Sequence, residues 1–397
     1  MRGMAALAVV FYHAAVWSSL TETDSALAPY LGRLDVGVTV FFLLSGFLLY
    51  RPFVRARLLG QRVPSTGAYG WRRALRILPA YWVALTLVAL LMPKPDVFEP
   101  RNAVIYYGFL QTYSDLALGG LPHAWSLGVE LIFYAFLPLW AFALRRLRVP
   151  ATVRAELIGL AALAAVAVVW NVIAVASAPD ASRAGSARLL GWFPAYLDHF
   201  AIGMALAVAS VAAERDGALP RPLAWLERRA WPAWAWALAA FVVVSVGAGL
   251  SPRNALFTPL SAGETLVRHW MYAAVAIGVL LPAAFGPPAR GAIRRFLGQR
   301  WILWVGLVSY GLYLWHFPVI EYARVRSPAL GGASWSDFAT LLALGAGGGV
   351  VAAAVSWYVL EKPLLRLKRL VRDRAVPPRD PETHLPEPQP PVHAGAR

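Results

Sequence analysis

Residues 1–20 read MRGMAALAVVFYHAAVWSSL, an almost wholly apolar stretch in which the ionisable side chains of Arg2 and His13 stand out. On an α-helix, eleven residues make about three turns and rise about 16 Å, so both side chains lie on nearly the same face, about half a bilayer apart. Ionisable groups inside a membrane span are costly and usually mark a pathway or a reactive site. The stretch therefore predicts a membrane helix that holds a charged ligand at one depth and exchanges protons at another.

The composition indicates a membrane protein rather than a soluble domain. The chain has 397 residues, of which 59% are hydrophobic and 15% are charged, whereas about a quarter of the residues in a soluble domain are charged. We therefore predict an all-α, polytopic membrane helix bundle with about ten transmembrane helices. The ten apolar stretches lie near residues 4–20, 36–50, 75–92, 124–144, 155–176, 190–212, 231–250, 266–286, 301–322 and 337–360. A shorter apolar segment at 102–112 is expected to be re-entrant or interfacial.

The distribution of Lys and Arg predicts the orientation of the chain. If the N-terminus is cytoplasmic, 28 of the 37 Lys and Arg residues lie on the cytoplasmic side and nine on the opposite side. Cytoplasmic loops carry an excess of these residues, so we predict a multi-pass plasma-membrane protein with both termini in the cytoplasm. The same excess explains the net charge of +16 and argues against nucleic-acid binding. The absence of cysteine excludes disulfides, cysteine nucleophiles and thiolate metal sites.

Two regions are predicted along the chain. Residues 1–372 form the transmembrane domain, and residues 4–20 are expected to be a retained span because they lack the small-residue cleavage site of a signal peptide. Residues 373–397 contain recurrent proline among polar residues. Such a segment cannot bury a core, so we predict a disordered cytoplasmic tail.

A cluster of arginines precedes the third apolar stretch, in the sequence WRRALRILPAYW (71–82). Arg72 and Arg76 share a helix face at this spacing, and Arg73 lies beside them. Two interpretations are equally open. The cluster is either a topology anchor with an aromatic belt or a clamp for phosphates, since guanidinium groups match phosphate geometry.

Two further segments place polar side chains inside predicted spans. The first, HAWSLGVELIFYAFLP (123–138), holds Glu130 one to two turns inside the membrane, where an unpaired carboxylate is strongly disfavoured. We therefore expect Glu130 to be functional or essentially paired. The second, SYGLYLWHFP (309–318), repeats Ser309, Tyr313 and His316 on roughly one helix face, which suits a structural hydrogen-bond network as well as a substrate surface. By contrast, Ser45 beside Gly46 favours close helix packing over ligand contact.

In combination, these segments resemble the acyltransferase 3 family of integral membrane acyltransferases. The hallmark of that family is Arg followed by ten residues and then His in the first span, which Arg2 and His13 match. The further matches occur in family order and cover nearly the whole membrane portion. They are GVTVFFLLSGFLL (37–49), RRALRILPAYW (72–82), WSLGVELIFY (125–134), SYGLYLWH (309–316) and VLEKP (359–363).

The resemblance implies an O-acyltransferase that moves an acyl group, usually acetyl, from acyl-coenzyme A (acyl-CoA) to a hydroxyl of a glycan, glycolipid or small natural product. Two departures from the family pattern stand out. An acidic lead usually precedes the Arg, so we expect a truncated or misassigned start before Arg2. Thr39 stands where the family often has Asp, and Asp35 is a candidate substitute. A multi-span exporter of a glycan or small metabolite is the competing interpretation, because buried Arg, His and Glu suit a transporter too.

Within the enzyme interpretation, the buried polar residues receive catalytic roles. His13 is the expected general base, because imidazole titrates near neutrality. Glu130 is expected to orient His13 or to stabilise its protonated form. Ser126 and Tyr313 are candidate donors to the developing oxyanion, and His316 is a candidate for the substrate surface.

The arginines receive the donor-binding role. Arg2 and some of Arg72, Arg73 and Arg76 are expected to hold the anionic nucleotide of acyl-CoA at the cytoplasmic face. The pantetheine arm would then present the thioester near His13. The expected partners are acyl-CoA, a hydroxyl-bearing acceptor and the lipid bilayer, and no metal ion is expected.

Overall fold

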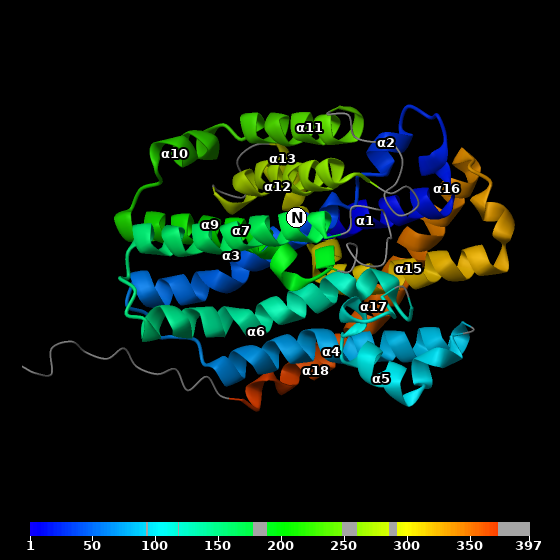
Figure 1. Ribbon diagram of the computed structural model, residues 1–397, viewed down its shortest axis with the longest axis horizontal. Coiled ribbons are helices and arrows are strands. Elements are labelled where there is room, and N and C mark those ends of the chain that lie inside the picture. The colour runs from blue at the N-terminus through cyan, green and yellow to red at the C-terminus, as the bar shows by residue number, and fades with distance from the viewer. Residues whose placement is uncertain (93, 118, 178–188, 248–259, 286–291, 372–397) are drawn as a thin grey trace, which may run out of the picture.

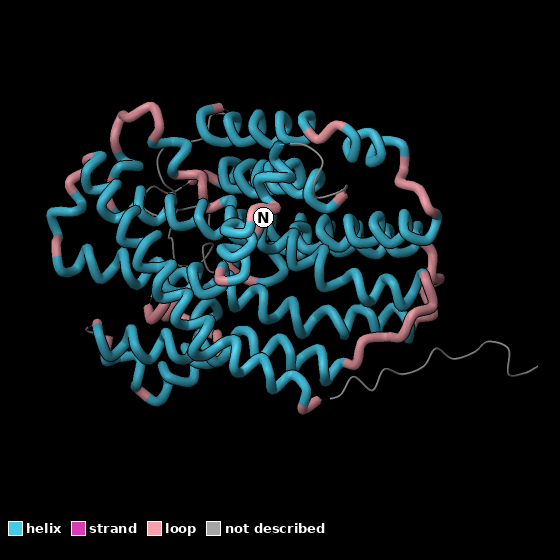
Figure 2. The backbone as a smooth tube through the Cα atoms, turned by 180° about the vertical axis from the view of Figure 1, so that it is seen from behind, coloured by secondary structure: helices cyan, strands magenta, loops and turns pink. Residues whose placement is uncertain are grey.

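The computed structural model describes the chain except residues 93, 118, 178–188, 248–259, 286–291 and 372–397 (Figure 1). The described part consists of helices joined by loops and contains no strand (Figure 2). This confirms the predicted all-α class. The proline-rich tail predicted at 373–397 lies outside the described residues.

Seven helical stretches in the described residues are long and apolar enough to cross a membrane. Two of these stretches join several helices, namely α2 (Ala28–Leu31) with α3 (Val36–Leu58), and Trp335–Arg369, which begins with α16 (Trp335–Ala343). The other five contain α4 (Thr66–Leu91), α6 (Trp125–Arg146), α7 (Val153–Ala176), α9 (Leu197–Asp216) and α12 (Ala262–Ala284).

Two bent helix pairs and one short helix complete the set. The pair α10 (Arg221–Arg228) and α11 (Trp231–Val246) is bent by 91°, and the pair α14 (Arg300–Leu307) and α15 (Ser309–Arg326) by 70°. Counting each pair as one span gives up to nine spans. The short apolar helix α1 (Arg2–Trp17) then brings the apolar segments to the predicted ten. The segment predicted at 102–112 contains the short helix α5 (Pro100–Tyr107).

The long helices α3, α4, α6, α7 and α9 run side by side along the long axis of the molecule (Figure 1). Both α3 and α6 end in arginines, Arg55 and Arg57 in the first and Arg145 and Arg146 in the second. We call this end of the bundle the basic end, and we call the end where α6 begins the opposite end. The two ends give the bundle the charge asymmetry that a membrane orientation requires.

Helix α1 is short for a membrane span. It has 16 residues, which correspond to about 24 Å of helix, less than the hydrocarbon thickness of a bilayer. The N-terminus lies midway along the bundle in both views (Figures 1 and 2). The Arg2 side chain is 28% exposed and lies 3.9 Å from Glu130 of α6.

Helices α3 and α9 make the most extensive helix contact of the described structure. Glycine permits this close approach on both sides. A Cβ added at Gly46 of α3 would lie 2.4 Å from the carbonyl oxygen of Phe200, and one added at Gly203 of α9 would lie 2.1 Å from that of Leu43. The sequence predicted that Ser45-Gly46 serves helix packing, and the close contact at Gly46 confirms this for the glycine.

We expect Gly203→Ala to destabilise the bundle by about 1–3 kcal/mol, because the added methyl group must push two backbones apart. Thermal unfolding of the purified protein in detergent measures this change. Gly263→Ala is the matched control, because a Cβ at Gly263 meets nothing within 4 Å. Equal melting temperatures for the two variants would contradict the packing argument.

Candidate functional site

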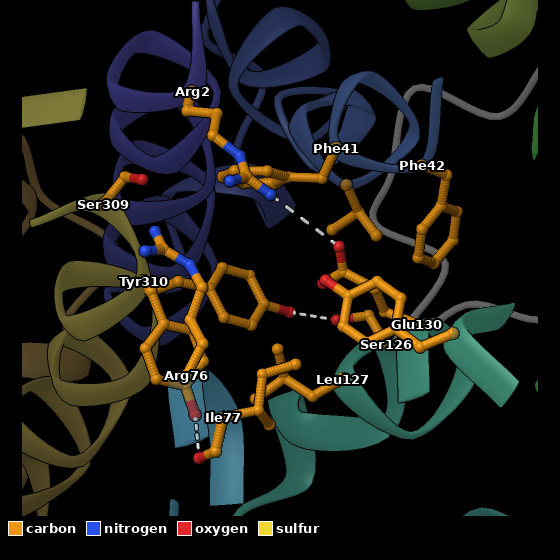
Figure 3. Close-up of a pocket in the computed structure, with 13 residues that line it drawn as sticks. Arg2, Phe41, Phe42, Arg76, Ile77, Ser126, Leu127, Glu130, Ser309 and Tyr310 are labelled. Atoms are coloured by element: carbon orange, nitrogen blue, oxygen red, sulfur yellow. Dashed lines mark hydrogen bonds and ion pairs between the residues drawn. The ribbon is translucent and has the colours of Figure 1, made fainter. Parts of the chain in front are cut away.

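A pocket inside the bundle is lined by side chains of α1, α3, α4, α6 and α15 (Figure 3). We call it the central pocket. Its volume is about 40 Å³, which suits a small chemical group rather than a nucleotide. Most of the lining is apolar or aromatic. The polar and charged members that concern the chemistry are Arg2, Arg76, Ser126, Glu130, Ser309 and Tyr313.

Arg2 and Glu130 face each other across this pocket (Figure 3). The Arg2 Nη2 atom lies 3.9 Å from Glu130 Oε1, and the Ser45 hydroxyl donates a short hydrogen bond to the same oxygen. Arg2 Nε is buried and has no hydrogen-bond partner among the described residues. Glu130 is thus paired, as its position in a span requires, while Arg2 retains an unused donor.

Ser126 and Tyr313 form a hydroxyl pair on the wall of the central pocket (Figure 3). Their oxygens are 2.7 Å apart, and the Tyr313 hydroxyl donates to the carbonyl oxygen of His123 at 2.9 Å. Because Tyr313 has only one hydroxyl hydrogen, Ser126 must be the donor to Tyr313. The Ser126 hydrogen is therefore the more available of the two for another acceptor.

Three buried histidines lie directly behind Tyr313. They are His13 of α1, His123 just before α6, and His316 of α15, and their exposed fractions are 9%, 4% and 0%. The ring centroids of His13 and His316 are 5.0 Å apart, and those of His123 and Tyr313 are 5.6 Å apart. The central pocket and the histidine cluster thus share Tyr313 as a common wall.

The hydrogen bonds of the cluster determine which nitrogens carry protons. His316 Nδ1 lies 2.9 Å from the Leu312 carbonyl oxygen, so this nitrogen carries the proton and Nε2 is an acceptor. His13 Nδ1 lies 3.0 Å from His316 Nε2 and 3.1 Å from the Val9 carbonyl oxygen, so it must donate. A neutral His13 then has its lone pair on Nε2, which makes no hydrogen bond among the described residues.

A second, larger cavity lies at the basic end, where the connection between α3 and α4 meets both helices. We call it the basic cavity. Its volume is about 440 Å³, within the range of about 300–1,000 Å³ that is typical of small-molecule sites. Arg62, Tyr69, Arg72 and Arg73 contribute its polar lining. The cavity thus combines the size and the positive charge needed for a phosphorylated ligand.

Arg73 lies between the two pockets. Its guanidinium carbon is 5.7 Å from the ring centroid of Tyr69, which lines the basic cavity, and 5.8 Å from that of Tyr134, which lines the central pocket. Arg73 Nε and the Tyr69 hydroxyl are buried without a hydrogen-bond partner among the described residues. Both groups are donors, and a buried donor without an acceptor in the protein can bind a water molecule or a ligand.

The structure distributes the predicted site residues over three neighbouring places. Arg72 and Arg73 lie at the basic cavity, and His13 and His316 lie in the histidine cluster. The remaining predicted residues line the central pocket, namely Arg2, Arg76, Glu130, Ser126 and Tyr313. Arg73 joins the basic cavity to the central pocket, and Tyr313 joins the central pocket to the histidine cluster.

One expected contact is not formed. Glu130 was expected to orient His13 or to stabilise its protonated form, but its carboxylate contacts Ser45, Arg2 and Tyr134. His13 instead forms a hydrogen bond with His316. The physical reason is that Arg2, on the same helix as His13 but about three turns away, holds the carboxylate at its own depth.

Three further residues of the site were not singled out from the sequence. His123 precedes the Glu130 motif and accepts the Tyr313 hydrogen bond through its backbone carbonyl. Tyr134 lies four residues after Glu130, a helical spacing that puts both on one face. Arg62 lies in the connection after α3, and only its place in the basic cavity distinguishes it from other arginines.

The fold and these pockets define an integral membrane protein. Inside its helix bundle, a pocket with polar and charged side chains adjoins a cluster of buried histidines. The family model described as an acyltransferase domain, that of the acyltransferase 3 family, matches residues 1–361. The chain therefore belongs to this family, as its motifs predicted. No solved structure matches the chain.

Several curated proteins are similar to this chain. The O-acetyltransferase OatA of Staphylococcus aureus (strain NCTC 8325 / PS 47) is 21% identical over 348 residues, which cover 82% of this chain and 50% of the relative. The peptidoglycan O-acetyltransferase OatA of Listeria monocytogenes is 23% identical over 339 residues, covering 81% and 48%. Nodulation protein 10 of Rhizobium leguminosarum bv. viciae is 25% identical over 396 residues, covering 93% and 92%. The chain thus spans about half the length of the two O-acetyltransferases and nearly all of the third relative.

We expect Ser45→Ala to destabilise the protein by about 1–3 kcal/mol, because it removes a hydrogen bond to a buried carboxylate. Thermal unfolding in detergent is the measurement. Ser177→Ala is the control, since the exposed Ser177 hydroxyl donates only to the carbonyl of its own helix. If Ser45→Ala melts at the wild-type temperature, the contact does not stabilise Glu130.

Proposed function

We propose that this protein is a membrane O-acyltransferase that uses acyl-CoA as donor and a hydroxyl of a glycan, glycolipid or small natural product as acceptor. The observation that carries the proposal is the order of the pockets. An arginine-lined cavity, a small central pocket and a histidine cluster follow one another, linked by Arg73 and Tyr313. In this order, the basic cavity would hold the nucleotide of acyl-CoA, the central pocket its thioester, and the histidine cluster would supply the base.

The donor nucleotide is assigned to the basic cavity. CoA carries several phosphate charges at one end, and guanidinium groups bind phosphates through parallel hydrogen bonds. The unused donors at Arg73 and Tyr69 supply positions for phosphate oxygens. On this assignment the basic end faces the cytoplasm, where acyl-CoA is made, which agrees with the excess of Lys and Arg there. The plasma membrane is the proposed location.

The thioester is assigned to the central pocket. From the basic cavity, the pantetheine arm passes Arg73, Arg76 and Arg2 and brings the acyl carbonyl to the Ser126 hydroxyl, on the side of the pocket that adjoins the histidine cluster. The free volume of about 40 Å³ favours a short acyl group such as acetyl. Ser126 can turn its hydrogen from Tyr313 to the developing oxyanion. Electrostatic stabilisation of this kind is usually a large part of catalysis.

His13 is assigned the role of general base. Its Nε2 lone pair takes the proton of the acceptor hydroxyl, whose oxygen attacks the thioester carbon. The tetrahedral intermediate then expels the CoA thiolate, which takes the proton back from His13. Throughout, the His13 Nδ1–H group remains hydrogen bonded to His316, which keeps Nε2 aimed in one direction. His316 is thus a positioning residue, and transfer is direct from CoA to the acceptor.

The acceptor is assigned from the relatives. Two of them are named O-acetyltransferases, and one of these is named for peptidoglycan, a glycan. A glycan hydroxyl at the opposite end of the bundle would reach the histidine cluster without crossing the basic cavity. Donor and acceptor would then enter from different ends, which lets the two substrates bind together.

We expect His13→Ala to lower product formation by at least about 100-fold, the usual contribution of a general base. His316→Phe should lower turnover less, while leaving CoA affinity unchanged. The measurement is mass spectrometry of acylated surface glycans, lipids and secreted metabolites in cells that express each variant. Phe11→Ala is the control, because Phe11 lies on the exposed side of the same helix.

Two outcomes would overturn this proposal. One is wild-type product formation by a membrane-inserted His13→Ala variant. The other is the same set of acylated products in cells with and without the wild-type protein. CoA release from acetyl-CoA in isolated membranes separates acyl transfer from simple export of an acceptor.

We expect Arg73→Ala and Arg62→Ala each to weaken CoA binding by about tenfold, since each removes one charge-assisted hydrogen bond worth about 1.5–3 kcal/mol. Isothermal titration calorimetry with CoA and the purified protein measures the Kd. The effect should shrink at high salt, because part of it is long-range attraction.

Arg101→Ala is the matched control for these variants. Arg101 lies in α5, is exposed and pairs with Asp115. Its loss removes the same charge from a place outside both pockets. Unchanged CoA affinity in Arg73→Ala and Arg62→Ala would remove the nucleotide site from the basic cavity.

A further inference from the structure

A second group of buried polar side chains lies between α9 and α12, outside the pockets described above. Asp198 and His199 are in the first turn of α9, and His269 is in α12. One oxygen of Asp198 and one nitrogen of each histidine all lie within 4.8 Å of one another. Asp198 and His199 are buried, with exposed fractions of 5% and 1%. We call this group the Asp-His-His cluster.

One ring nitrogen of His199 is free to bind a metal, while the other donates a hydrogen bond. Its Nε2 atom lies 3.3 Å from the carbonyl oxygen of His269, so Nε2 carries the proton and donates. Its Nδ1 atom therefore holds a lone pair, and this atom is buried without a hydrogen-bond partner among the described residues. Metal-bound histidines typically donate their other ring N–H to a carbonyl or carboxylate in this way.

The contact between Asp198 and His269 has dimensions that also suit a shared ion. Asp198 Oδ2 and His269 Nε2 are 2.8 Å apart. Two ligands of one zinc ion, each about 2.0–2.1 Å from the metal, are separated by about 3 Å. A second Asp198 oxygen is held by the backbone N–H of His199 at 2.8 Å, which fixes the carboxylate.

We propose that Asp198, His199 and His269 bind a divalent transition-metal ion of the zinc type. Nitrogen and carboxylate ligands in this combination suit zinc. A divalent cation would also neutralise the buried Asp198 carboxylate. Three protein ligands leave a fourth position for water or a ligand oxygen. The sequence predicted no metal ion, and His269 lies 71 residues after Asp198 in the chain.

The metal would connect two parts of the bundle next to the central pocket. It would link α9, which packs on α3, to α12, which packs on α11. Tyr196 lies against the cluster, with its ring centroid 5.8 Å from those of both His199 and His269. The same Tyr196 ring is 5.0 Å from Phe42, which lines the central pocket. Metal binding would thus fix the wall of the pocket through one aromatic contact.

The test uses the full-length protein, purified in detergent with an affinity tag free of histidine. After treatment with EDTA, the protein is dialysed against Zn²⁺ and its metal content is measured by plasma mass spectrometry. We expect about one zinc ion per chain and a higher melting temperature than for the EDTA-treated protein. Addition of Co²⁺ in place of Zn²⁺ should give the visible absorption of a four-coordinate site.

Asp198→Asn and His269→Gln should weaken zinc binding by at least about tenfold, because changes even in the outer shell of a metal site have this effect. His123→Gln is the control, since it alters a buried histidine of the other cluster. The proposal is overturned if the wild-type protein retains no Zn²⁺ and gives no Co²⁺ absorption. It is also overturned if the two cluster variants bind zinc as tightly as the wild type. Neither readout depends on acyl transfer.

Discussion

The charge pair between Arg2 and Glu130 is the constraint on which the site depends. Each of these groups is costly in the interior of a membrane bundle, so each determines where the other must lie. Glu130 is held further by Ser45, which ties α1, α3 and α6 together at one point. Removing one member of such a pair leaves an uncompensated buried charge, which is more damaging than removing both.

The Arg2 side chain is not fully hydrogen bonded within the protein, which leaves it able to bind a ligand. The 3.9 Å separation is longer than a hydrogen bond, and Arg2 Nε has no partner among the described residues. Arg73 Nε and the Tyr69 hydroxyl repeat the pattern closer to the basic end. A row of unused donors from the basic cavity to the central pocket is the arrangement that an anionic donor substrate would satisfy. In the histidine cluster, His13 Nδ1 has a partner in His316, and His123 Nδ1 is buried without a partner among the described residues.

The sequence predicted the fold well because its signals are local. A span is recognised from its own apolar residues, and the ten stretches found in the sequence all correspond to helical segments of the structure, two of them bent. The contact between Arg2 and Glu130 could not be predicted in the same way, because it joins two helices that are distant in the chain. Sequence spacing fixes the distance from Arg2 to His13 along one helix, but it cannot fix the position of that helix relative to its neighbours.

The sequence by itself determined the class of protein, the family and the separate residues that carry polar groups into the membrane. Burying an ionisable side chain in a membrane is costly, so Arg, His and Glu are rare in apolar segments and can be recognised there from the sequence. Only the tertiary structure decided which of these residues meet. His13 pairs with His316 although 303 residues separate them, and Asp198 meets His269 across 71 residues. Such contacts depend on how helices pack side by side, and helix packing is set by the sum of many small contacts rather than by any local pattern.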